Sequence, residues 1–209
     1  MCIRDSYRAF NDLLIEKEPA PDETVLTVQK GYSGIFHKKG GNASYSAMAN
    51  TMRGIYGTDV LIAAANSFTG SVRQAEYTKK EAAAMVMPNG LRSYRCEMTG
   101  AELKETVKAF VEGYEGGLPV FNRGSLPVVS GIAIEVQENG GSYTLTGVTR
   151  SGQPLRDDDT VTVTCLATEK QMAPLLQDKT GAFERGEATV KNTWSDACLL
   201  YTSPSPRDS

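Results

Sequence analysis

The spacing of apolar and polar residues predicts alternating helices and strands through the middle of the chain. From residue 42, the stretch NASYSAMANTMRGIYG has the small and apolar residues of a helix that ends at Gly57. The apolar run from Asp59 to Ala65 predicts a buried strand, and the alternation from Leu91 to Met98 predicts a second one. This order of elements indicates an α/β region.

Two helices of this region carry a start signal. Thr78 and Glu81, and then Thr99 and Glu102, have the Thr-x-x-Glu spacing in which side chain and backbone satisfy each other's free donors. An amphipathic helix buries one apolar stripe. In the second helix that stripe consists of Leu103, Val107, Phe110 and Val111.

A β-rich part follows. Its three stretches are VVSGIAIEV, SYTLTGVTR and TVTVTCLA, separated by the turns ENGG and SGQPLRDDD. They predict an antiparallel unit, so the expected fold class is α/β (α+β), a mixed sheet flanked by helices with an antiparallel β hairpin unit. Beyond it, TEKQMAPLLQ and ERGEATVKNTWSD predict short helices.

Less regular segments precede the α/β region. YRAFNDLLIEKE predicts a helix, and the prolines of EPAPDE predict a linker after it. TVLTVQ predicts a strand, and GYSGIFHKKGGN predicts a glycine-punctuated loop. We expect residues 7–24 to be an interdomain helix and linker, and residues 25–197 to form one domain.

The two ends are predicted to be translated sequencing adapter. The DNA sequence ATG TGT ATA AGA GAC AG would encode MCIRDS, and its complementary strand in a shifted frame, TGT CTC TTA TAC ACA, would encode the CLLYT near the other end. We therefore expect residues 1–6 and 198–209 to lie outside the domain.

Charge and cysteine content narrow the possible partners. The chain has 22 basic and 25 acidic residues and a net charge of -3, so nothing indicates a nucleic-acid partner. No apolar run is long enough to span a bilayer. Outside the two ends, only Cys96 and Cys165 remain. Both lie in predicted strands, where two buried thiols and a single bridge are both compatible with the pattern.

Five motifs occur in a fixed order between Ala43 and Thr168. They are DVLIAAAN with a glycine-containing turn after it, EYTKKEAAAMVMPNG, MTGAELKETV, LPVVSGIAIEV and SGQPLRDDDTVTVTCLAT. In this order they resemble the C-terminal, substrate-binding domain of the 5'-nucleotidase family. The resemblance implies the mixed-sheet fold of that domain. It also implies a calcineurin-like metallophosphoesterase domain of the same chain as partner.

The resemblance further implies a ligand and a location. The ligand would be a small-molecule nucleoside, nucleotide or related phosphoester, and the location extracytoplasmic, whether secreted, periplasmic or at the cell surface. Hydrolysis would need a divalent metal pair, which the resemblance places in an N-terminal domain outside this sequence. The single histidine, His37, lies in a Gly/Lys loop without a D-x-H or G-N-H-E partner, which favours a solvated histidine over a ligand. No cofactor is expected within this chain.

Several positions depart from the family pattern. Arg73 is out of register with the family's G-I-R arginine, and Ser67 and Phe68 replace a diglycine. Leu126 stands where the family has an aromatic residue that would stack on a base. The P-F-G-N element becomes PNGL, and no G-G-D-G-Y signature follows the last strand. The scaffold motifs are thus matched better than the pocket motifs.

The first loop predicted to contact a ligand is ANSFTGSVR. It offers the Asn66 amide, the Phe68 ring, Gly70 for close backbone approach and Arg73 for an anion. Ordinary turn chemistry with an exposed arginine is the alternative interpretation.

The second such loop is PVFNRGS. It offers Phe121 to stack on a planar group, Asn122 to read the edge of that group and Arg123 to hold phosphate. The same alternative applies here. The acidic turn RDDD lacks the alternating spacing of a calcium loop and is interpreted as a solvated turn.

Two hypotheses follow from these features. In the first, the chain is the substrate-specificity domain of a 5'-nucleotidase-like phosphoesterase, and by itself hydrolyses nothing. In the second, the altered pocket belongs to a non-catalytic cell-surface or extracytoplasmic ligand-binding module on the same fold.

Overall fold

The structure is a computed structural model of the chain. It describes residues 24–28, 43–64, 67–68, 73–86, 90–113, 126–140, 142–178, 183–190 and 192–194. The predicted helix in YRAFNDLLIEKE, the interdomain linker, His37 and both ends lie outside the described residues.

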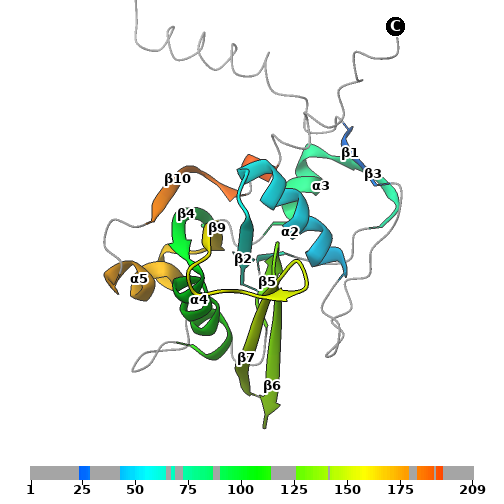
Figure 1. The fold of residues 1–209 in the computed structure, drawn as a ribbon. Coiled ribbons are helices and arrows are strands. Elements are labelled where there is room, and N and C mark those ends of the chain that lie inside the picture. Colours follow the sequence, from blue (N-terminus) through cyan, green and yellow to red (C-terminus); the bar gives the residue numbers. More distant parts are fainter. Residues whose placement is uncertain are drawn as a thin grey trace, which may run out of the picture.

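The centre of the fold is a five-stranded mixed sheet (Figure 1). Its strands, in spatial order, are β10 (Glu184–Thr189), β4 (Arg92–Thr99), β9 (Thr160–Ala167), β2 (Val60–Ala63) and β5 (Val128–Ser130). Only β2 and β9 run parallel, and the other neighbours are antiparallel. All four residues of β2 are buried, as its apolar run predicts.

Helices cover both faces of this sheet. Because successive strand residues point to opposite faces, β2 contributes Val60 and Ile62 to one core cluster and Leu61 and Ala63 to the other. The first cluster contains side chains of α4 (Gly100–Glu112) and α5 (Glu169–Asp178). The second contains side chains of α2 (Ala43–Tyr56) and α3 (Lys79–Ala84). The sheet is thus the middle layer between two apolar layers.

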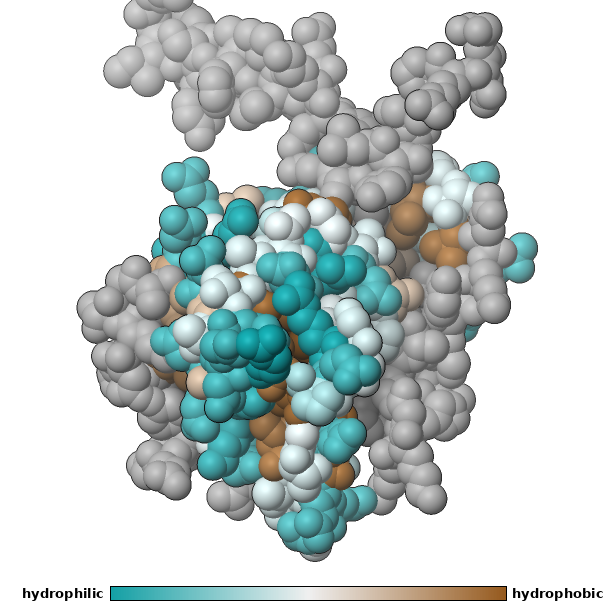
Figure 2. All heavy atoms as spheres, viewed as in Figure 1, coloured by the Kyte–Doolittle hydropathy of each residue, from teal (hydrophilic) through white to brown (hydrophobic). Residues whose placement is uncertain are grey.

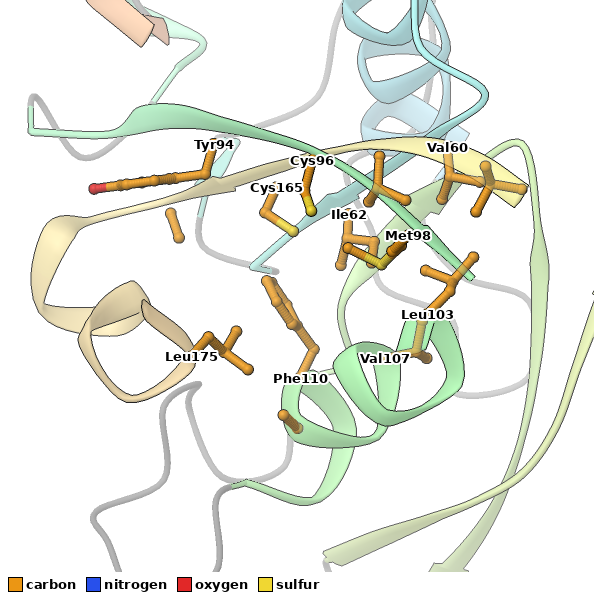
Figure 3. Close-up of a cluster of buried hydrophobic side chains, with 14 of the residues drawn as sticks. Val60, Ile62, Tyr94, Cys96, Met98, Leu103, Val107, Phe110, Cys165 and Leu175 are labelled. Atoms are coloured by element: carbon orange, nitrogen blue, oxygen red, sulfur yellow. The ribbon is translucent and has the colours of Figure 1, made fainter. Parts of the chain in front are cut away.

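Figure 3 shows the first cluster. Leu103, Val107 and Phe110 of α4 point from the helix toward the strands, as the predicted apolar stripe requires. Cys96 and Cys165 lie among the strand side chains of the same cluster.

A second, three-stranded sheet projects away from the first (Figure 1). It consists of β6 (Ala133–Asn139), β7 (Ser142–Arg150) and β8 (Gln153–Pro154). α4 supports it, since the Leu145 N–H donates to Glu112 Oε1 at 2.8 Å. We call β6 and β7 the hairpin, since they pair antiparallel and follow each other in sequence. The face seen in Figure 2 is mostly hydrophilic, with a narrow hydrophobic band between α4 and the hairpin.

A small two-stranded sheet completes the fold. β1 (Thr24–Val28) pairs antiparallel with β3 (Ala75–Thr78). β3 was not expected from the sequence, because the residues after it carry a strong helix start. Both predicted capping boxes are present, and Gly57 follows α2 with a φ of 60°. The predicted fold class is confirmed.

Three details of the sequence prediction are wrong. VVSGIAIEV is not one strand: the chain turns at Gly131, with a φ of 85°, and divides into β5 and β6, which belong to different sheets. TVTVTCLA forms β9 in the five-stranded sheet, between β4 and β2, and does not join the hairpin. Both predictions failed because the sheet that a strand joins depends on partner strands that are distant in sequence.

The third wrong detail concerns ERGEATVKNTWSD. Its first six residues form β10 and not a helix, and Arg185 pairs with Tyr94 of β4. A Cβ at Gly186 would overlap the Ser93 hydroxyl, so glycine allows the two strands to approach. Of the described residues in this segment, 190 and 192–194 are helical, and Trp194 packs in the second cluster.

Candidate functional site

Four strand ends meet at one edge of the five-stranded sheet. β2 and β9 end there, and β4 and β5 begin there, because Ala63 pairs with both Leu166 and Val128 while Arg92 pairs with Ala167. We call this the loop edge. Ligands of open α/β sheets bind outside the carboxyl ends of parallel strands, and β2 and β9 are the parallel pair here.

The two segments that carry the predicted ligand contacts are both attached to the sheet at the loop edge. Residues 64–74 follow β2, and residues 114–127 precede β5, so both are attached to the sheet at the pair formed by Ala63 and Val128. They are far apart in sequence, and the antiparallel pairing of β2 with β5 brings their anchor points together. Of the predicted contacts, Phe68 and Arg73 are described, whereas these lie outside the described residues: Asn66, Gly70, Phe121, Asn122 and Arg123.

Phe68 lies in the core. Its side chain is 2% exposed, and its backbone forms an isolated antiparallel bridge with Val86. The Phe68 ring lies 6.0 Å from the Tyr45 ring, centroid to centroid, in a tilted arrangement. It packs in the second cluster between α2 and α3. Contact between this ring and a ligand stays a prediction.

Arg73 is exposed, and its backbone is fixed by a tyrosine. The Arg73 N–H donates to the Tyr77 hydroxyl at 2.7 Å, and that hydroxyl donates to the Arg73 carbonyl oxygen at 3.0 Å. Tyr77 is anchored in β3, opposite Leu26 of β1, and its ring packs on the second cluster. Sequence reasoning missed Tyr77. Arg73 and Tyr77 are four residues apart, a spacing that predicts a contact only within a helix, and this segment has no helical periodicity.

Ser67 is a second residue that sequence reasoning missed. It is fully buried, and its N–H donates to the Ala64 carbonyl oxygen at 2.9 Å in a tight turn after β2. Its hydroxyl is buried and has no hydrogen-bond partner among the described residues. Buried polar groups normally have partners, so this hydroxyl is an unused donor at the loop edge. The replacement of a family glycine by serine was the signal available in the sequence.

At the opposite edge of the sheet, polar side chains form a hydrogen-bonded network. The Asp59 carboxylate accepts from the Thr162 N–H at 2.9 Å, from the Thr162 hydroxyl at 2.8 Å and from Arg150 Nη2 at 2.7 Å. The Thr162 backbone hydrogen bond is the main reason why the pKa of Asp59 is lowered, and the Arg150 charge adds to the effect. Asp59 thereby ties β2 to β9 and to the hairpin.

The Ser-Gly pair of LPVVSGIAIEV belongs to the same network. The Ser130 hydroxyl accepts from Arg53 Nε at 2.9 Å and donates to Asn50 Oδ1 at 2.6 Å. A Cβ at Gly131 would overlap the Asp59 carbonyl oxygen, so only glycine fits this close approach. In this chain the motif therefore holds α2 against β5, away from the loop edge.

The acidic turn has a structural role. Arg156 binds Asp158 with two hydrogen bonds of 3.0 and 2.6 Å, and Asp157 pairs with Lys104 of α4 at 2.7 Å. The backbone of the turn caps α4, because the Gly100 N–H donates to the Asp159 carbonyl oxygen at 2.7 Å. These partners agree with a solvated turn at the surface.

The two cysteines are buried free thiols. Cys96 and Cys165 are both buried and form no disulfide. Burial raises the pKa of the Cys165 thiol to about 12, and the neighbouring Cys96 contributes to the rise. A thiol with so high a pKa is a poor nucleophile at neutral pH.

Neither a metal centre nor a membrane segment is found in the described part of the chain. Within the described ranges, no three His, Cys, Asp or Glu side chains are grouped so that they could hold a metal ion. Among the same residues, no helix has the length and apolar character needed to cross a bilayer.

Comparison with known proteins finds similarity at the level of structure. No protein-family model matches the sequence, and no curated protein matches it. The structure of the NAD nucleotidase NadN from Haemophilus influenzae is similar with a TM-score of 0.65 at 18% identity, over 95% of this chain and 39% of that one.

Two other solved structures show the same relationship. A putative 5'-nucleotidase from Staphylococcus aureus gives a TM-score of 0.61 at 14% identity, over 99% of this chain and 42% of that chain. The sulfate thiohydrolase SoxB from Thermus thermophilus gives a TM-score of 0.59 at 11% identity, over 95% of this chain and 36% of that chain. The chain thus spans about two fifths of the length of these proteins. It has the fold of the corresponding part of these three structures, which include the NAD nucleotidase and the putative 5'-nucleotidase.

Proposed function

We propose that this chain is the substrate-specificity domain of a 5'-nucleotidase-like metallophosphoesterase. It would bind a nucleoside, a nucleotide or a related phosphoester at the loop edge. The observation that supports the proposal is the pairing of Ala63 with Val128, because the first segment, residues 64–74, follows one of these residues and the second segment, residues 114–127, precedes the other. The fold shared with nucleotidase structures supports it.

The proposed contacts divide into two chemical roles. Phe121 stacks on the base and Asn122 hydrogen-bonds to its edge, while Arg73 and Arg123 neutralise phosphate. Asn66 and Gly70 complete the first loop, as a polar contact and a point of close backbone approach. Phe68 stays a weaker member of the set, because its ring is 2% exposed.

Hydrolysis is assigned to another part of the protein. Phosphomonoester hydrolysis by this class uses two metal ions that polarise the phosphate and generate a hydroxide nucleophile. We propose that an N-terminal metallophosphoesterase domain of the same chain holds this pair, and that the complete protein is extracytoplasmic. The chain spans 39% of NadN, which leaves room for such a domain in a protein of that size.

A non-catalytic ligand-binding module is the second candidate function. One observation favours it: Phe68 is buried where a ligand contact was expected. The two functions differ in whether the complete protein hydrolyses the ligand that this domain binds.

Calorimetric titration with adenosine and AMP tests the proposal. We expect saturable binding of both ligands at up to millimolar concentration, and weaker binding of both by about two- to ten-fold in Phe121→Ala, because one aromatic stack is lost. Tyr143→Ala, which removes a half-buried ring from the hairpin, is the matched control and should leave both affinities unchanged. Absence of saturable binding to the wild-type chain would exclude the nucleoside site and favour the second candidate.

A further inference from the structure

We propose that Tyr77 is a positioning residue that sets the phosphate contact of Arg73. This inference rests on the proposed function, since it assigns Arg73 to the phosphate of a nucleotide ligand. Tyr77 lies in the motif EYTKKEAAAMVMPNG, but neither that motif nor the comparisons give it a role.

The geometry is a two-point clamp on one backbone unit. A tyrosine hydroxyl has one donor and free acceptor lone pairs, and here it uses both on the same residue. It accepts from the Arg73 N–H at 2.7 Å and donates to the Arg73 carbonyl oxygen at 3.0 Å. Together the two hydrogen bonds fix the position and the direction of the Arg73 peptide groups.

The clamp is itself anchored. Tyr77 pairs with Leu26 across β1 and β3, and its half-buried ring packs on the second core cluster. β3 leads directly into α3, whose Thr78–Glu81 capping box is complete. The hydroxyl is therefore held by the scaffold, whereas the Arg73 side chain is exposed at the end of the loop that follows β2.

This arrangement matches what an arginine needs to bind an anion well. A long side chain loses entropy when it is held in one place, and a fixed backbone reduces the part of this cost that falls on the loop. The ring of Tyr77 alone would satisfy the packing. The hydroxyl is what reaches Arg73, so the proposed role belongs to a single oxygen atom.

Tyr77→Phe isolates that atom, because it keeps the ring and removes the hydroxyl. We expect AMP to bind about three- to ten-fold more weakly, as two hydrogen bonds are lost, while adenosine affinity stays unchanged. Inorganic phosphate should compete with AMP less well for the variant. Tyr143→Phe, the same chemical change on the hairpin, is the control and should alter neither ligand. A purely structural role for Tyr77 would weaken both ligands alike.

A double-mutant cycle shows whether the effect passes through Arg73. Arg73→Gln should lower AMP affinity, and Tyr77→Phe should add nothing in that background. Arg156→Gln is the matched charge control, because Arg156 is an exposed arginine in the turn at the opposite edge. An equal loss from Tyr77→Phe in both backgrounds, or an unchanged ratio of AMP to adenosine affinity, would overturn the inference while leaving the nucleoside site in place. Failure of the wild-type chain to bind either ligand would remove the proposed function and this inference together.

Discussion

At the scale of single residues, Asp59 shows how one carboxylate can join separate elements. It precedes β2, binds Thr162 of β9 through two hydrogen bonds and pairs with Arg150 of β7. Its pKa is lowered by these partners. A carboxyl group with a depressed folded pKa stabilises the fold above its unfolded pKa, and this contribution is lost as the pH falls through the folded value.

Asp59→Asn should therefore destabilise the protein in a pH-dependent way. We expect the free energy of unfolding to fall by about 1–2 kcal/mol at pH 7, a range that allows for partial solvent screening of a half-exposed group. The difference from wild type should shrink as the pH falls below about 4, the pKa of the carboxyl in the unfolded chain, and through the lower pKa of the folded carboxyl. Urea denaturation at neutral and acidic pH measures this. Asp158→Asn, in the exposed turn, is the control, and an equal deficit at both pH values would contradict the assignment.

Residue roles could be predicted where they depend on neighbours in sequence. Thr78 and Thr99 were identified as helix caps because the partner glutamate stands three positions later. Phe68 was predicted as a ligand contact, which stays a prediction; that its ring packs against Tyr45 of α2 is revealed by no local pattern. Tyr77 was missed for the same reason, since its partner is a backbone group in an irregular segment.

At the scale of elements, the start of α4 shows why a motif can be specific without being catalytic. Thr99 and Glu102 form the capping box, and the turn that ends at Asp159 adds a backbone acceptor for the Gly100 N–H. A Cβ at Gly100 would overlap the Arg156 carbonyl oxygen. Capping hydrogen bonds thus require the threonine and the glutamate, and close packing requires the glycine. The T-G-A-E-L motif is explained by the helix start without a ligand.

Gly100→Ala should be destabilising by about 1–3 kcal/mol, because the turn must move away from the helix to make room for the methyl group. Gly54→Ala is the matched control. Gly54 lies within α2 with no atom near its missing Cβ, so alanine there should stabilise the protein by about 0.5–1 kcal/mol. Thermal denaturation of the two variants should shift in opposite directions, and a neutral Gly100→Ala would disprove the close contact.

The elements that could be predicted are those with a clear period or cap. β2 and the apolar stripe of α4 follow from the spacing of apolar residues, and both capping boxes are in place. β10 was predicted as a helix because Glu184–Thr189 is polar and carries no strand alternation. Its pairing with β4 decides its conformation, and that partner lies about ninety residues earlier.

At the scale of the whole molecule, the two edges of the sheet have different chemistry. The opposite edge is occupied by Asp59, Arg150 and Ser130, whose partners are all within the chain. The loop edge carries the exposed Arg73 and the Ser67 hydroxyl, which has no partner within the part of the chain that the structure describes. Ser130, Gly131 and the start of α4, which match the family motifs, lie at the opposite edge, whereas Ser67 and Phe68, which depart from them, follow β2 at the loop edge.

This division leads to a prediction about catalysis by the purified chain. A two-metal phosphoesterase needs several His, Asp and Asn ligands, whereas this sequence has one histidine, and the described residues contain no group able to hold a metal. We therefore expect no phosphate release from AMP with Mg²⁺, Mn²⁺ or Zn²⁺ present, even under conditions in which calorimetry detects AMP binding. A colorimetric phosphate assay, with an added phosphatase as positive control, measures this. Metal-dependent release that His37→Ala abolishes would show that hydrolysis resides in this chain, and binding without release would place recognition and catalysis in separate domains.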